Sequence, residues 1–134
     1  MGGWSNPCTE TPSGGSTVGI SGCLAQELEA WESVRSAVHA RLLVAARKYD
    51  EDPVDGAPPV GASLVAAKAA WEAHRDAQCT YEWSEYAGGT MRGIVAVSCR
   101  LQLTADRCAY LVAHGSHQKH FERSEKPWTD KSLR

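Results

Sequence analysis

Five cysteines are the residues of this sequence with the clearest capacity for chemistry. They stand at positions 8, 23, 79, 99 and 108 of a chain of 134 residues. Small exported domains often need disulfides because their cores are small, whereas cytosolic thiols stay reduced. The cysteine content therefore predicts a secreted or periplasmic protein. Leaving one of five cysteines unpaired and joining the other four in three ways gives 15 connectivities, and the count alone does not choose among them.

Two of these cysteines flank a pair of glycines at nearly equal distances. Cys79 lies nine residues before Gly88, and Cys99 lies ten residues after Gly89. If both flanks are helices and the chain folds back at the glycines, the two sulfurs lie at similar heights. The spacing predicts a Cys79–Cys99 disulfide that joins two antiparallel helices. Such a bond closes a loop of about 20 residues, which corresponds to roughly 3 kcal/mol in the chain-entropy description.

Three histidines near the end of the chain, His114, His117 and His120, are spaced by three residues. On a helix this spacing would align them along one side and suggest zinc. Gly115 and the polar surroundings argue against a rigid site, so we assign no metal and no cofactor. Adventitious binding of a metal by these histidines stays open.

General acid–base chemistry by His74 together with Glu72 or Asp76 is a further possibility. It would need a substrate pocket, and a narrow helical bundle offers little concave volume. The sequence therefore predicts a protein that is not an enzyme.

The elements that position these residues are predicted from three stripes of apolar residues with helical spacing. Helices are expected from about residue 23 to 49, from 62 to 86, and from about 90 to 113. The stripes are Leu24, Leu28, Trp31, Arg35, Val38, Leu42, Ala45 and Tyr49; then Leu64, Ala67, Trp71, His74, Gln78 and Tyr81; then Ile94, Val97, Leu101, Thr104, Cys108 and Leu111. Three such stripes can bury one another as an antiparallel three-helix bundle, which makes the fold class all-α.

Four polar residues interrupt these stripes: Arg35, His74, Gln78 and Thr104. Polar residues at such positions commonly fix the register of a bundle through a satisfied network. Arg75 shares one flank of the second helix with Trp71 and Cys79, and on a partly buried flank it needs an acidic partner. We expect this partner to be Asp106 or a glutamate of the first helix, with Asp76 pointing elsewhere.

The domain organisation follows from composition. Residues 1–20 are rich in proline, glycine and serine and are predicted to be irregular, residues 21–113 are predicted to form the bundle, and residues 114–134 are predicted to form a polar tail that is irregular or loosely docked. Asp50 to Gly61, with Pro53, Pro58 and Pro59, form the connector between the first two helices. The start of the chain has no basic, apolar leader, so we expect a mature exported chain whose leader has been removed.

Composition excludes several classes of function. The formal net charge is −2 and 22% of the residues are charged, which does not favour nucleic acid as a partner. No run of about 18 apolar residues exists, so the sequence predicts no membrane span. The expected partner is another protein, and the chain is expected to be a monomer or a weak dimer. Cys108 is expected to be a small core residue, although an unpaired cysteine also permits a disulfide-linked dimer.

The stretch from residue 64 to 111 reads L-x6-W-x3-RD-x2-C, then GGT, then C-x-L-x-LT-x2-R-x3-L. This ordered set resembles the LprI-type domain, a family of secreted bacterial proteins of which some inhibit lysozyme. The sequence departs from the family pattern at His74 and Cys108. The family also carries two upstream cysteines, and the resemblance favours Cys8–Cys23 beside Cys79–Cys99. Within this frame the predicted structural core is Trp31, Trp71, Arg75, Asp76, Leu101, Thr104 and Arg107.

The resemblance implies binding and inhibition of a peptidoglycan-cleaving enzyme such as lysozyme. The predicted partner-binding residues are those of the helical joint, Gly88, Gly89, Thr90, Met91 and Arg92. A lysozyme-type glycosidase works with two carboxylates in a cleft, and a protruding arginine could engage them. The alternative for these residues is a plain turn, in which the glycines reverse the chain and Thr90 caps the third helix. Alternative functions are an immunity protein against a delivered envelope toxin and a structural envelope factor.

Overall fold

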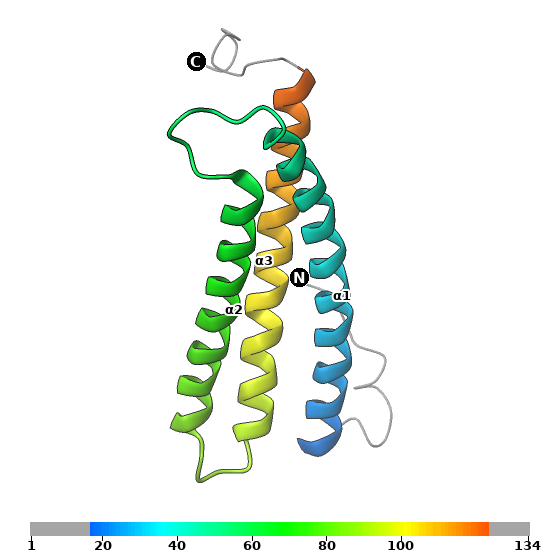
Figure 1. The fold of residues 1–134 in the computed structure, drawn as a ribbon. Coiled ribbons are helices and arrows are strands. Elements are labelled where there is room, and N and C mark those ends of the chain that lie inside the picture. Colours follow the sequence, from blue (N-terminus) through cyan, green and yellow to red (C-terminus); the bar gives the residue numbers. More distant parts are fainter. Residues whose placement is uncertain (1–16, 124–134) are drawn as a thin grey trace, which may run out of the picture.

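Residues 17–123 fold into three long helices that lie side by side (Figure 1). The structure is a computed structural model that describes residues 17–123, with side chains described for residues 19–115. Helix α1 spans Thr17–Tyr49, α2 spans Val60–Glu85 and α3 spans Arg92–Arg123. Consecutive helices run in opposite directions, and no strand occurs in residues 17–123. The prediction of an all-α, antiparallel three-helix bundle is confirmed.

The helix ends differ from the predicted ones at both ends of the described chain. Helix α1 begins at Thr17, before the predicted start at Cys23, so the predicted irregular segment 1–20 is helical at its end. Helix α3 continues to Arg123, so the prediction of an irregular tail was wrong for residues 114–123. At Gly115 the helix passes close to α1, where an added Cβ would lie 3.6 Å from Leu42 Cδ2. A single glycine costs roughly 1 kcal/mol inside a helix and does not by itself end one.

The connector between α1 and α2 is fastened by a side chain that sequence reasoning did not single out. The carboxylate of Asp50, directly after α1, accepts the backbone N–H of Val60 at 2.7 Å and that of Gly61 at 2.9 Å. These are unpaired donors of the first turn of α2, so Asp50 caps a helix ten residues further along the chain. A side chain at position 61 would crowd this carboxylate, because an added Cβ would lie 3.1 Å from Oδ2.

The core is a thin seam of mostly small residues. Leu101, Thr104, Cys108 and Leu111 of the predicted α3 stripe are buried, and so are Cys99 and Ala105 of the same helix. The predicted stripe of α2 was partly wrong, because Ala67, His74 and Tyr81 are exposed. Arg75 and Cys79 are buried instead. The polar or charged members of the core among the described residues are Arg35, Arg75 and Thr104.

None of the helices within residues 17–123 is long and apolar enough to cross a membrane. The predicted absence of a membrane-spanning helix therefore holds for this part of the chain.

Candidate functional site

A single aromatic ring organises the middle of the bundle. The guanidinium of Arg35 on α1 lies 4.8 Å from the centre of the Trp71 ring, and that of Arg75 lies 5.0 Å from it. Arg107 on α3 lies 5.8 Å from the same ring and 5.5 Å from the ring of Tyr110. The electron-rich face of an indole attracts cations, most strongly where water is excluded. One tryptophan of α2 thus holds arginines from all three helices.

Carboxylates from two helices neutralise two of these arginines, Arg35 and Arg75. Glu32 accepts Arg35 Nε at 3.0 Å and also pairs with Arg75, which joins α1 to α2. Glu72 of α2 accepts Arg35 Nη2 at 3.0 Å, and Arg75 Nη1 lies 3.3 Å from the hydroxyl oxygen of Thr104. The prediction that the first helix supplies an acidic partner for Arg75 is confirmed by Glu32. We call Glu32, Arg35, Trp71, Glu72, Arg75 and Thr104, together with Asp76 beside Arg75, the central cluster.

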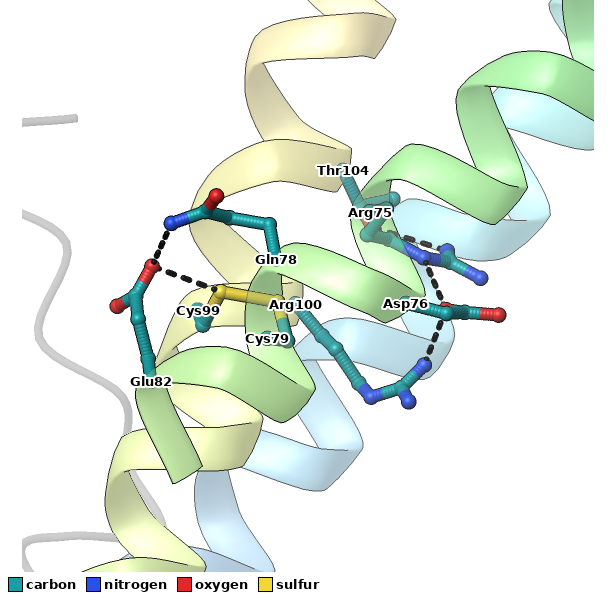
Figure 2. The surroundings of a disulfide bond; sticks show 8 residues. All are labelled: Arg75, Asp76, Gln78, Cys79, Glu82, Cys99, Arg100 and Thr104. Atoms are coloured by element: carbon teal, nitrogen blue, oxygen red, sulfur yellow. Dashed lines mark hydrogen bonds and ion pairs between the residues drawn. A yellow bond between two sulfur atoms is a disulfide. The ribbon is translucent and has the colours of Figure 1, made fainter. Parts of the chain in front are cut away.

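The network extends to the flank of α2 that lies beside α3 (Figure 2). Asp76 Oδ1 accepts Arg75 Nε at 3.1 Å and Arg100 Nη1 at 2.6 Å. The expectation that Asp76 points elsewhere was wrong, because the Arg75 side chain turns back along its own helix. Asp106, the other partner considered for Arg75, instead accepts the amide of Gln102 at 3.0 Å.

The charges of the central cluster set the protonation of its carboxylates. Burial raises the pKa of Glu72, but hydrogen bonds from Arg35 and Lys68 outweigh it, so this pKa lies below its ordinary value. Burial likewise raises the pKa of Asp76, and Arg75 and Arg100 outweigh it. Burial lowers the pKa of Arg35, yet its two glutamates leave it above the ordinary value. All these groups are held in their charged forms.

The polar groups of the central cluster satisfy one another. Among the described residues, no buried side-chain nitrogen or oxygen lacks a hydrogen-bond partner. His74, considered as an acid–base catalyst, is exposed and lies outside the seam. Within the described chain no group of three or more histidine, cysteine or acidic residues could hold a metal. His117 and His120 lie in α3, but their side chains are outside the described residues.

The predicted hairpin disulfide is present. Cys79 of α2 and Cys99 of α3 are bonded, with their Cα atoms 5.5 Å apart (Figure 2). Cys23 is fully buried in α1, whereas Cys8 lies outside the described residues, so the Cys8–Cys23 pairing stays a prediction. Cys108 is a buried free thiol whose sulfur lies 3.4 Å from the carbonyl oxygen of Trp31. Burial raises the pKa of this thiol, which suits a core residue rather than a nucleophile.

The joint between α2 and α3 lies at one end of the bundle, and every residue from 83 to 93 is exposed. We call residues 86–92 the tip. The amide of Gly89 donates to the carbonyl of Tyr86 at 2.9 Å, which closes the turn. Arg92 Nη1 donates to the carbonyl oxygen of Ala87 at 3.3 Å, so this guanidinium lies across the turn in contact with solvent. Because α3 begins at Arg92, Thr90 is not at its N-cap position.

Sequence reasoning missed the aromatic residues that lead into the tip. Tyr81, Trp83 and Tyr86 are exposed by 59%, 38% and 49%, and Met91 by 46%. Three exposed aromatic residues within six positions are a concentration found nowhere else in the described chain. The signal was available in the sequence, because α2 keeps an aromatic-rich composition beyond the disulfide, where the core ends.

Comparison with known families assigns the chain. The profile of the family described as "Lysozyme inhibitor LprI" matches residues 8–111, which is most of the sequence. This chain belongs to the LprI lysozyme-inhibitor family. The match contains the central cluster, the Cys79–Cys99 disulfide and the tip.

One curated relative shares part of this sequence. The "Uncharacterized 17.7 kDa protein in puhA 5'region" of Rhodobacter capsulatus is 28% identical over 98 residues, which are 70% of this chain and 60% of the relative. The chain therefore spans less than two thirds of the length of that relative. No solved structure matches the chain significantly.

The residues that carry the LprI pattern meet in three dimensions. Trp71, Arg75 and Arg107 contact one another through the indole ring, while Asp76 and Thr104 bond to Arg75. The pattern thus includes residues that pack α2 against α3, and its GGT element lies in the tip.

Proposed function

We propose that this chain binds and inhibits a peptidoglycan-cleaving enzyme of the lysozyme kind, in the periplasm or outside the cell, and that the tip enters the enzyme's cleft. Membership of the LprI lysozyme-inhibitor family is the observation that carries the proposal. Two features of the chain support it: a disulfide of the kind found in exported proteins, and a solvent-exposed joint at one end of a rigid rod. The chain acts by occupying space and has no catalytic role.

The tip has the composition of an interface anchor. Tyr86 and Met91 offer apolar surface that water covers in the free protein, and tyrosine is enriched among the residues that dominate binding energies. The Cys79–Cys99 bond holds both flanks of the tip, so little order is lost when it binds.

Arg92 supplies the charge that such a target requires. Glycosidases of this kind hydrolyse their substrate between two carboxyl groups. The Arg92 guanidinium is bound only to one exposed carbonyl oxygen at 3.3 Å among the described residues. A carboxylate can replace that carbonyl and form the stronger, charge-assisted pair. The inserted tip would then exclude the polysaccharide from the cleft.

The proposal is tested with Arg92→Glu and a matched control, Arg41→Glu, which makes the same charge change on the exposed surface of α1. Inhibition of lysozyme-driven clearing of cell-wall suspensions and thermal melting are measured side by side. Repulsion between like charges at the contact should weaken inhibition by about a hundredfold for Arg92→Glu. Melting should be unchanged or slightly higher, because an acidic residue suits the first turn of a helix.

The control Arg41→Glu should inhibit as well as the parent. Equal inhibition by all three proteins would remove the tip from the mechanism. A parent protein that inhibits none of the lysozymes tested would contradict the proposed function itself.

A further inference from the structure

A hollow on the surface lies between the last turn of α2 and the first turns of α3. It measures about 450 Å³. Tyr86, Ile94 and Val95 give it an apolar lining, and Glu82 and Glu85 place carboxylates at its edge. Figure 2 shows Glu82 on the side of the disulfide opposite to Asp76 and Arg100. This hollow therefore opens away from the ion pairs of the central cluster.

A second hollow, of about 410 Å³, lies between α1 and α3. Its apolar lining includes Leu24, Trp31 and Leu101, and its only ionisable lining residue is Asp106. Trp31 is partly accessible here, so an indole face is available to a side chain entering the hollow.

The two hollows are neighbours on one surface. Ser98 and Gln102, one turn apart on α3, line both of them and form the ridge between them. In Figure 1 this helix runs between α1 and α2, which supply the outer walls. We call the two hollows and their shared ridge the acidic face.

The charges of the acidic face lack counterions. All charged side chains that line it are carboxylates, those of Glu82, Glu85 and Asp106. Glu82 and Asp106 accept hydrogen bonds from glutamine amides at 3.0 Å, which leaves their negative charge in place. None of the three forms an ion pair with a lysine or arginine of the described chain. By contrast, the carboxylates of Glu32, Glu72 and Asp76 are each paired with arginine.

We propose that the acidic face is a second docking surface, which adjoins the tip at Tyr86 and binds a basic polypeptide surface. Arginine or lysine side chains of the partner pair with the three carboxylates, and apolar side chains between them enter the two hollows. Long basic side chains suit this lining because their methylene stems pack on apolar groups while their charged ends reach the rim. Opposite charges across the contact also accelerate association.

The probe is a short fluorescein-labelled peptide of alternating arginine and leucine, and the control probe carries glutamate in place of arginine. Binding to the full chain is followed by fluorescence anisotropy. The test variant is Glu82→Gln/Glu85→Gln/Asp106→Asn, which keeps size and hydrogen-bonding oxygens. The matched control is Glu51→Gln/Asp52→Asn/Asp55→Asn in the exposed connector, which also removes three negative charges but leaves the acidic face unchanged. Melting by circular dichroism checks that both variants fold like the parent.

The parent should bind the arginine peptide and not the glutamate peptide, with affinity that falls as salt is raised. The test variant should bind about tenfold more weakly, as the sum of three exposed ion pairs, and the connector control should change by less than about twofold. Gln102→Lys, which places a cation on the exposed ridge, should weaken binding in the same direction.

If both triple variants bind the arginine peptide equally weakly, net charge explains the effect and the proposal is overturned. A parent protein that fails to bind this peptide would overturn it as well. Dimerisation of the parent that is lost in the test variant would make a second copy of the chain the occupant, and this too overturns it. The lysozyme assay distinguishes this inference from the proposed function. Peptide binding without lysozyme inhibition would contradict only the proposed function. Lysozyme inhibition without peptide binding would contradict only this inference.

Discussion

The central cluster comes from all three helices and the tip joins two of them, and the two regions treat their polar groups in opposite ways. In the cluster, arginines, carboxylates and the Trp71 ring satisfy one another, and Arg35 and Arg75 are exposed by only 8% and 9%. At the tip, aromatic side chains and Arg92 face solvent with few protein partners. The comparison teaches that buried charges of this chain are satisfied within the protein, whereas the exposed joint presents its polar and apolar groups to solvent.

The largest effect is expected when Trp71 is replaced by alanine, because its ring contacts arginines from all three helices. The loss of a large aromatic residue from a packed seam costs about 3–5 kcal/mol of unfolding free energy. Trp83→Ala, at the exposed end of α2, should cost less than about 1 kcal/mol by the ordinary behaviour of surface sites. Urea unfolding of both variants measures the difference. Similar losses would contradict the division into cluster and tip.

Removal of the disulfide between these two regions should cause the second-largest loss of stability. Cys79→Ser/Cys99→Ser removes a cross-link between residues 20 apart in sequence. The chain-entropy description gives a loss of about 3 kcal/mol, and the buried free thiol of Cys108 should stay unreactive in the folded variant. Chemical unfolding and native maleimide labelling measure both properties. If all cysteines of the unreduced parent react with maleimide, the disulfide is absent and the argument for export fails with it.

The smallest effect concerns pH. Burial lowers the pKa of His39 below 6.5, and the cations Lys68 and Arg35 lower it further. The imidazole of His39 therefore binds a proton more readily in the unfolded chain than in the folded one. As a result, the contribution of His39 to the free energy of unfolding is highest above about pH 6.5 and declines as the pH falls below that value. When the pH is lowered from 7.5 to 5, the melting temperature of the parent should fall, and that of His39→Gln should fall less. The difference should develop at pH values around the ordinary histidine pKa of roughly 6.5. Parallel curves would exclude His39 as the cause.

The carboxylates of the cluster act in a separate range. Because the pKa values of Glu72 and Asp76 are depressed, their stabilisation is present above their unfolded values of 4.5 and 3.8 and is lost as the pH falls through the folded values. A decline confined to this acidic range would therefore assign the pH dependence to the ion pairs rather than to His39.

How far the sequence predicts the fold depends on the strength of each stripe. The α3 stripe was correct because Leu101, Cys108 and Leu111 are apolar in a polar context. The α2 stripe was placed wrongly around His74, since alanines occupy much of that helix and small side chains define a face poorly. Arg75 could be predicted to need a carboxylate. That Glu32 supplies it depends on the rotation of α1, which no local pattern encodes.

The candidate site was also predictable only in part. The two glycines predicted the turn at the tip, and the spacing of Cys79 and Cys99 predicted the disulfide between the helices on either side of it. The acidic face was not predictable, because its residues come from three helices and share no spacing. The role of Asp50 was also hidden, since its two bonds span ten residues of a loop whose path the sequence does not specify.

The Cys79–Cys99 bond also changes what a protease can do to this molecule. A peptide bond cut anywhere between the two cysteines, for instance after the exposed Arg92, opens the loop without separating the pieces, because both remain joined through sulfur. Exposed loop ends are the preferred sites of such cuts. An exported protein that meets digestive enzymes can thus be nicked at its most accessible point and persist as one covalent unit.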